Sequence, residues 1–384
     1  MLLLILFGTS QEAHAKKADD MNQRKSVWSL VLLLSLVLGL FVPYISMAEG
    51  EIAAENTEEV GETFEDEIVH PIFEDRVPMA VMINNIIEAR PHSGLDKAKL
   101  IYEVVVEGGI TRFLLVTDET EGVLGSIRSA RPAFFELAAE WKSAYSYVGN
   151  GEYVAASPLA SYIKNLDASN IGGGAYYRTS HRVAPHNLYG SLEGLYNFAE
   201  QSLGLDMSLS EPLDQIMISE IPVDRSAAEA TLNVEPAIAI DFSYSSDING
   251  IISASSHGYR YDNERGAYLK YTDNIILTEE QTGEIVPVEN VIFMKLPHTL
   301  MSNGVHWSIA YTSEKDANGQ LIPREATLMS GGKAYPLEFT KETPDAPINF
   351  TLNGEKLVLD KGLTFIQVLP VDAPLFYEGV ASVG

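Results

Sequence analysis

The sequence predicts an α+β fold in two parts, a mixed-sheet N-terminal domain followed by a β-rich second domain. In the first part, apolar segments of strand length mix with amphipathic helical segments and show no regular strand–helix alternation. In the second part, nearly all apolar segments are short and are separated by turn residues. Hydrophobic residues at 46% and charged residues at 21% are typical of a globular chain, here of 384 residues.

The N-terminal domain is predicted to cover residues 76–204. Gly108 and Gly109 separate two apolar segments, so we expect a two-residue hairpin turn there. Ser191 is predicted as the N-cap of the last helix and Gly204 as its C-cap. The strands are predicted at 79–84, 100–106, 110–117 and 145–148. The helices are predicted at 132–142, 153–163 and 191–203.

The second domain is predicted to cover residues 236–372, between a connector at 205–235 and a tail at 373–384. The connector shows no strong hydrophobic period. Turn sequences such as Asn353 followed by Gly354 separate the strands of this domain. The strands are predicted at 237–242, 267–277, 288–294, 306–311, 334–339, 356–359 and 364–370.

The beginning of the chain indicates export. A basic pair, an apolar segment at 27–42 and the small residues of Ser46-Met47-Ala48 form the pattern of a secretory signal over residues 1–48, with Met21 as an alternative translation start. An uncleaved membrane anchor is the other interpretation, because the apolar segment falls just below the ~17–25 residues that span a bilayer. Residues 49–75 hold many acidic and no basic residues, which predicts a disordered tether. Either interpretation places the rest of the chain outside the cytoplasm.

Composition excludes several functional classes. The chain has no cysteine, so disulfides, cysteine-bound zinc and thiol catalysis are excluded. The formal net charge of -27 argues against nucleic-acid binding, since the phosphate backbone would be repelled. The histidines show no spacing of a helical metal-binding pair, and we expect neither a metal nor a cofactor.

Arginine is concentrated in the first domain, at predicted loops and strand ends. The segment Arg128-Ser129-Ala130-Arg131 precedes a predicted helix, where free backbone N–H groups favour an anion. Guanidinium groups bind carboxylate and phosphate through paired donors. An internal network in which the arginines pair with Glu103, Glu107 and Asp118 is the alternative. The predicted ligand-binding residues are Arg112, Arg128, Ser129, Arg131, Arg178, Arg182, His186, Asn187, Glu103 and Glu107.

A dense group of polar residues at 177–189 also suggests a functional loop. In an alternative, catalytic interpretation, His186 is a general base, Ser129 is the nucleophile, and Glu103 or Glu107 orients the histidine. No G-x-S-x-G nucleophile elbow accompanies these residues. The leading interpretation therefore assigns no catalytic residue and treats the chain as non-enzymatic.

Four sequence blocks follow one another between residues 78 and 200: ARPHSGL at 89–95, IYE and EGGITRF within 101–113, IRSAR at 127–131 and RVAPHNLY at 182–189. Together they resemble the YerB-like lipoprotein family, also called DUF3048, of Gram-positive bacteria. The resemblance implies an α+β N-terminal domain, a separate C-terminal domain and a location outside the cell. It implies no catalytic residues, because the family has no known function. Family members carry a lipobox cysteine that this chain lacks, so we do not expect a lipoprotein.

The leading functional prediction is an extracytoplasmic binding protein of the bacterial cell envelope. Its ligand would be anionic or polar, such as a peptidoglycan or teichoic-acid fragment or an acidic segment of an envelope protein. A cell-envelope hydrolase or transferase and a scaffold for wall-modifying enzymes are the alternatives. We expect no nucleic-acid partner, and contact with the membrane only through an uncleaved signal segment.

Overall fold

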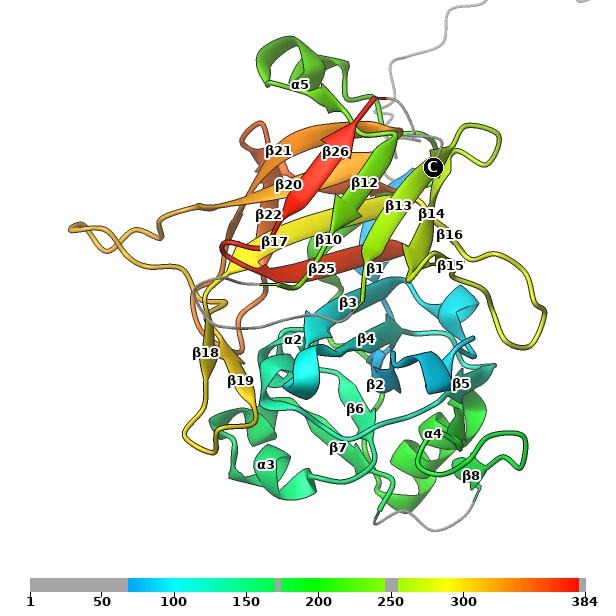
Figure 1. Ribbon diagram of the computed structural model, residues 1–384. Coiled ribbons are helices and arrows are strands. Elements are labelled where there is room, and N and C mark those ends of the chain that lie inside the picture. The colour runs from blue at the N-terminus through cyan, green and yellow to red at the C-terminus, as the bar shows by residue number, and fades with distance from the viewer. Residues whose placement is uncertain (1–67, 170–173, 246–254, 380–384) are drawn as a thin grey trace, which may run out of the picture. The chain divides into compact units, whose positions relative to one another are not determined.

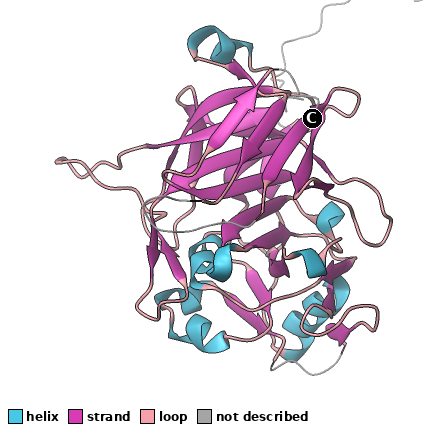
Figure 2. Ribbon diagram, in the orientation of Figure 1, coloured by secondary structure: helices cyan, strands magenta, loops and turns pink. Residues whose placement is uncertain are grey.

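The computed structural model describes residues 68–169, 174–245 and 255–379, which belong to one compact unit (Figure 1). The predicted signal, the predicted tether up to residue 67 and the end of the predicted tail lie outside the described residues. Within the described part, no helix is long and apolar enough to cross a membrane. Strands dominate and the helices are few and short, which confirms the α+β prediction with its large β content (Figure 2).

A central sheet of twelve strands contains residues from both predicted domains. β25 (Thr364–Pro370) of the C-terminal half pairs in parallel with β3 (Leu100–Val105) of the N-terminal half, so the two halves share one hydrogen-bonded sheet. Before β25 come β23 (Glu355–Lys356), β22 (Asn349–Leu352), β21 (Lys333–Thr340), β20 (Arg324–Ser330) and β17 (Asn290–Leu296). After β3 come β4 (Thr111–Thr117), β2 (Met79–Asn84), β6 (Ala144–Tyr147) and β7 (Lys164–Asp167), and β11 (Glu235–Pro236) pairs with β21.

Alternate residues of the central strands face opposite sides of this sheet and enter two hydrophobic cores. In β2, Ala80 and Met82 pack into one core, whereas Met79, Val81 and Ile83 pack into the other. The sequence of β2 is apolar almost throughout because both faces of the sheet are covered. Burial of such side chains favours folding by about 25 cal/mol for each Å² of apolar surface removed from water.

Smaller sheets supply the other side of each core. Ile240 and Tyr259 of a six-stranded sheet share a core with Val81, and Ile216 of a three-stranded sheet shares the other core with Met82. The six strands are β15 (Ile275–Ile276), β14 (Ala267–Thr272), β13 (His257–Asp262), β12 (Ala239–Phe242), β26 (Leu375–Glu378) and β16 (Pro287–Val288). The three strands are β1 (Val69–Phe73), β10 (Leu213–Ser219) and β24 (Val358–Asp360). Two further small sheets contain β5 (Val123–Gly125), β9 (Leu188–Ser191) and β8 (Tyr176–Arg178), and β18 (His298–Leu300) with β19 (Trp307–Ile309).

The α-helices are shorter than the predicted helical segments, because 3-10 or π segments make up part of each one. Within the predicted helix at 153–163, Pro158 cannot donate a helical hydrogen bond and disfavours helical backbone at Ser157, so α3 ends before them and a 3-10 segment follows. α4 begins after the predicted N-cap Ser191, whose Oγ accepts a hydrogen bond from Gly194 N at 3.1 Å. The α-helices are α2 (Phe135–Ala139), α3 (Gly151–Ala156), α4 (Leu192–Asn197) and α5 (Ser226–Thr231).

Three strands lie in the predicted tether, connector and tail. β1 occupies the end of the predicted tether, β10 lies in the predicted connector together with α5, and β26 lies in the predicted tail. Phe73 of β1 and Ile216 of β10 are buried, and β26 pairs with β12. These strands are stabilised by partners that are remote in sequence, which a local hydrophobic pattern does not reveal.

Candidate functional site

The β3–β4 turn and the loop after β5 bring one glutamate and three arginines together. Glu107 lies in the turn, where Gly108 adopts a left-handed φ of 71° that a residue with a side chain would disfavour. Arg112 follows near the start of β4, and the loop that contains Arg128 and Arg131 contacts both residues. We call Glu107, Arg112, Arg128 and Arg131 the arginine cluster.

Glu107 is the shared partner of two of these arginines. Arg112 Nη2 lies 3.1 Å from Glu107 Oε1, and Arg131 donates to Oε2 from Nε at 2.6 Å and to Oε1 from Nη2. Arg112 Nη1 also donates to the carbonyl oxygen of Ser129 at 2.6 Å. Burial would raise the pKa of Glu107, but the hydrogen bond from Arg131 and the charges of both arginines lower it to about 2. The alternative of an internal network therefore applies to Arg112 and Arg131.

Positive charge nevertheless exceeds negative charge in the arginine cluster. Its three guanidinium groups face one carboxylate, and the buried Nε atoms of Arg112 and Arg128 have no hydrogen-bond partner among the described residues. Burial and the charge of Arg131 lower the pKa of Arg128. Buried polar groups are nearly always hydrogen-bonded, so these two free donors are unusual.

The polar loop at 177–189 meets the loop of the arginine cluster at its C-terminal end. Ile127 N donates to Leu188 O at 2.8 Å, so the two predicted loops leave from neighbouring backbone positions. His186 Nδ1 lies 2.9 Å from Asn84 Nδ2. Burial, together with the charge of Arg128, lowers the pKa of His186. The structure thus places two loops that are distant in sequence at one location.

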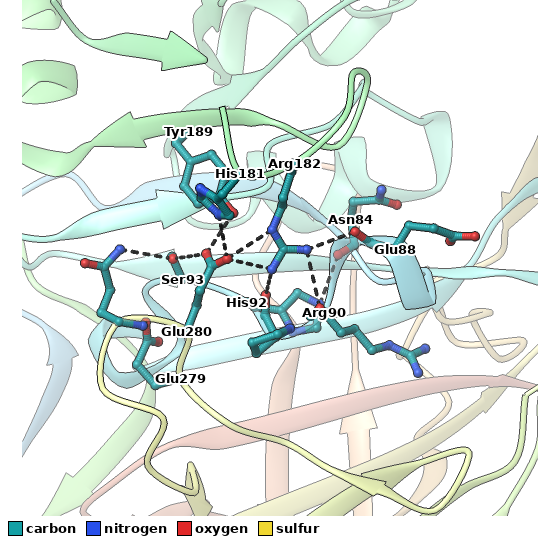
Figure 3. Close-up of polar contacts among 12 residues, drawn as sticks. Asn84, Glu88, Arg90, His92, Ser93, His181, Arg182, Tyr189, Glu279 and Glu280 are labelled. Atoms are coloured by element: carbon teal, nitrogen blue, oxygen red, sulfur yellow. Dashed lines mark hydrogen bonds and ion pairs between the residues drawn. The ribbon is translucent and has the colours of Figure 1, made fainter. Parts of the chain in front are cut away.

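Arg182 belongs to a different set of contacts, centred on Glu280 of the C-terminal half (Figure 3). Arg182 donates to the Glu280 carboxylate from Nε at 3.0 Å and from Nη2 at 2.6 Å. Ser93 Oγ and Tyr189 OH donate to it at 2.6 and 2.7 Å, and His181 Nε2 lies at 3.0 Å. Burial would raise the pKa of Glu280, but the hydrogen bonds from Ser93 and Arg182 lower it to about 2. These contacts hold the polar loop in place and neutralise Arg182.

Glu103 has partners other than those predicted for it. It is fully buried in the core, with Lys270 Nζ at 2.7 Å and His257 Nδ1 at 3.5 Å from its carboxylate. It is therefore not the orienting partner of His186. The described residues show no hydrogen bond between Ser129 and His186, and His186 Nδ1 lies beside Asn84 Nδ2 instead.

Arg178 and Asn187, the two remaining predicted residues, contact each other. Arg178 Nη1 donates to Asn187 Oδ1 at 2.8 Å, at an exposed position. In the segments that the structure describes, no group of three or more His, Asp or Glu side chains is arranged to hold a metal ion.

Sequence reasoning did not identify Glu280, Lys270 or His257 as members of polar clusters. Glu280 is distant in sequence from its partners and has no motif around it. The sequence pattern around Lys270 could have identified it. Lys270 lies two residues from both Tyr268 and Thr272 along one predicted strand, so all three side chains are on the same face of the strand and point into the core. A lysine at an inward position predicts a buried carboxylate partner.

The chain belongs to the DUF3048 family. The N-terminal domain of this "Protein of unknown function (DUF3048)" matches residues 67–206, and its C-terminal domain matches residues 248–366. A relative from Bacillus subtilis (strain 168), named "Putative lipoprotein YerB", is 27% identical over 316 residues, which cover 79% of this chain and 85% of the relative. The crystal structure of the YerB protein from Bacillus subtilis matches with a TM-score of 0.62 and 22% identity, over 79% of this chain and 94% of that chain, and has the same fold. The resemblance predicted from the four sequence blocks is confirmed.

Proposed function

We propose that this protein is an extracytoplasmic binding protein of the bacterial envelope that recognises an anionic ligand through the arginine cluster. The composition of that cluster carries the proposal: its one carboxylate pairs with Arg112 and Arg131 but not with Arg128, and two buried Nε–H groups have no acceptor among the described residues. An anionic ligand that contacts the partly exposed guanidinium of Arg128 would supply the missing negative charge. The description of the Bacillus subtilis relative as a lipoprotein supports a location outside the cytoplasm.

Phosphate and carboxylate groups fit the donors of the cluster, because a planar guanidinium binds either group through two parallel hydrogen bonds. Teichoic-acid fragments carry the first group, and peptidoglycan fragments or an acidic segment of an envelope protein carry the second. Arg128 is the member that we expect to contact the ligand directly. It is only partly buried, and no salt bridge to a carboxylate occupies it in the described structure.

Titration calorimetry with teichoic-acid and peptidoglycan fragments tests the proposal. Replacing Arg128 by Gln removes the charge but keeps a polar side chain. A hydrogen bond to a charged group contributes about 1.5–3 kcal/mol, so the affinity should fall about 10- to 100-fold. The control Arg265→Gln removes the same charge from an exposed arginine that pairs with Asp262, and the affinity should not change.

Salt provides a second readout, because higher ionic strength should weaken binding to a partly exposed cationic site. The proposal is contradicted if none of these fragments binds the protein. It is also contradicted if the Arg128 and Arg265 variants lose affinity equally, because binding would then depend on overall charge and not on the arginine cluster.

A further inference from the structure

Lys270, Glu103 and Asn85 meet in the core between the central sheet and the six-stranded sheet. Lys270 on β14 and Glu103 on β3 are completely buried, and Lys270 Nζ lies 2.7 Å from Glu103 Oε2. Asn85 follows β2, is 2% exposed, and donates from Nδ2 to Glu103 Oε1 at 3.0 Å. One carboxylate therefore holds an amine and a carboxamide at the same time.

Aromatic rings surround the amine of Lys270. Its Nζ lies 5.5, 5.0 and 5.4 Å from the ring centroids of Phe242, Tyr259 and Phe365. Burial lowers the pKa of Lys270, although the charge of Glu103 acts in the opposite direction. In water-free surroundings a lysine gives its proton to a neighbouring carboxylate more readily than in solvent, and the neutral amine is a nucleophile.

The carboxamide of Asn85 is held at both ends. Arg90 Nε donates to Asn85 Oδ1 at 3.3 Å, and Asn85 Nδ2 donates to Thr111 Oγ1 at 2.7 Å in addition to its bond with Glu103. The Arg90 guanidinium would stabilise the negative charge that develops on Oδ1 when a nucleophile attacks Cγ. Glu103, once protonated, lies where it can protonate the leaving nitrogen.

We propose that Lys270 and Asn85 form an intramolecular isopeptide bond, with Glu103 carrying the protons. Glu103 takes one proton from Lys270 Nζ, and the free amine attacks Asn85 Cγ while the electron pair of the C=O bond moves to Oδ1 beside Arg90. Glu103 then protonates Nδ2, the electron pair on Oδ1 re-forms the C=O bond, the Cγ–Nδ2 bond breaks with its electrons on nitrogen, and ammonia leaves. The new amide nitrogen returns its extra proton to Glu103. An ammonium, a carboxylate and a primary amide thus become a secondary amide, a carboxylic acid and ammonia, with no other reactant.

A second buried lysine–carboxylate pair in the chain serves as an internal control. Lys341 Nζ lies 3.2 Å from Glu140 Oε2, and both side chains are almost completely buried. The other donors to this carboxylate in the described structure are the Tyr102 hydroxyl and the Ile348 backbone N–H. No carboxamide side chain donates to it there, so Lys341 should remain an ordinary ion-paired lysine.

The bond would connect segments that match different domains of the family. Asn85 lies in the match to the N-terminal domain and Lys270 in the match to the C-terminal domain. A covalent link between remote positions restricts the unfolded chain as a disulfide does, and this chain has no cysteine to form one. The reaction also replaces a buried ion pair, whose desolvation is unfavourable, by a neutral amide.

Tryptic digestion of the denatured full-length protein, followed by mass spectrometry, tests the proposal. Trypsin cannot cleave after an acylated Lys270, so the expected product is peptide 77–97 joined to peptide 266–295, lighter than their sum by one ammonia molecule. Fragmentation of this product should assign the bond to Asn85. Cleavage after Lys341 should release peptide 334–341 normally. The variants Lys270→Met and Glu103→Gln should lack the linked product.

Recovery of free peptide 266–270 in the same yield as peptide 334–341 would overturn the proposal. A linked product that has lost water instead of ammonia, with its bond at Glu103, would overturn the assignment of Asn85. The wild-type digest is decisive by itself, because a covalent product is detected whether or not the variants fold. The result is also independent of anion binding at the arginine cluster.

Discussion

Replacing Glu280 by Gln should release the polar loop that adjoins the arginine cluster. The Glu280 carboxylate accepts hydrogen bonds from Arg182, Ser93 and Tyr189, and the Arg182 and Glu280 side chains are only 9% and 15% exposed. Glutamine has nearly the same size as glutamate. It keeps one acceptor oxygen but loses the charge, so Arg182 would remain largely buried without its carboxylate partner.

The size of the effect follows from how much of the Arg182 interaction survives. Removing one partner of a buried ion pair typically destabilises a protein by about 3–5 kcal/mol. Arg182 would keep its hydrogen bonds to the backbone carbonyl oxygens of Glu88 and Pro91, at 2.9 and 2.6 Å. We therefore expect a loss near the lower limit, about 3 kcal/mol, because part of the arginine charge remains hydrogen-bonded.

Urea unfolding and hydrogen exchange measure the two consequences. The unfolding midpoint should fall with an unchanged m-value, and backbone amides of residues 178–187 should exchange faster than in the wild type. The control Glu284→Gln removes a carboxylate from an exposed position near the same turn and should change neither measurement. A midpoint and an exchange profile of Glu280→Gln that match those of Glu284→Gln would refute the reasoning.

Three further predictions concern stability. Gly94→Ala should lower the free energy of unfolding by about 2 kcal/mol or more. Gly94 has a left-handed φ of 87°, and the Cβ of the alanine would lie 2.6 Å from the Val123 carbonyl oxygen. An unchanged urea midpoint would contradict this prediction. Ser191→Ala should cost about 1 kcal/mol by removing the N-cap of α4, and faster amide exchange confined to α4 would support that cause. Folding lowers the pKa of Glu280 from 4.5 to about 2. The contribution of the Glu280 carboxylate to the free energy of unfolding is therefore fully present above pH 4.5 and is lost as the pH falls toward 2. Wild-type stability should therefore decrease more steeply over that range than the stability of Glu280→Gln, and parallel pH profiles would argue against the lowered pKa.

Local sequence patterns located the long, continuous apolar strands accurately. β2 and β25 have the predicted limits, because each is a continuous apolar segment that is covered on both faces of the central sheet. The predicted helix at 153–163 is divided, because Pro158 interrupts an amphipathic segment that otherwise looks continuous. β1, β10 and β26 were not predicted, since their stability depends on strands that are distant in the chain.

Within the candidate site, sequence reasoning identified the arginines and named Glu107 among their possible partners, but it could not decide which carboxylate meets which arginine. Arg112, Arg128 and Arg131 stood out because guanidinium groups were concentrated at loops of an otherwise acidic chain. The same reasoning grouped Arg182 and Glu103 with them, although Arg182 pairs with Glu280 and Glu103 is buried against Lys270. Charge and spacing identify residues that can interact, but they do not state which pairs come within hydrogen-bond distance.

The absence of disulfides, the β-rich α+β fold class and the blocks that identify the family can be read from the sequence, because these properties depend on composition and on local order along the chain. Which carboxylate meets each cation depends on the folded arrangement: Glu107 meets Arg112 and Arg131, and Glu103 meets Lys270. Electrostatic and hydrogen-bond interactions act over a few ångströms in space. The order of strands across the sheets, with β25 beside β3, sets those distances, and no local pattern encodes that order.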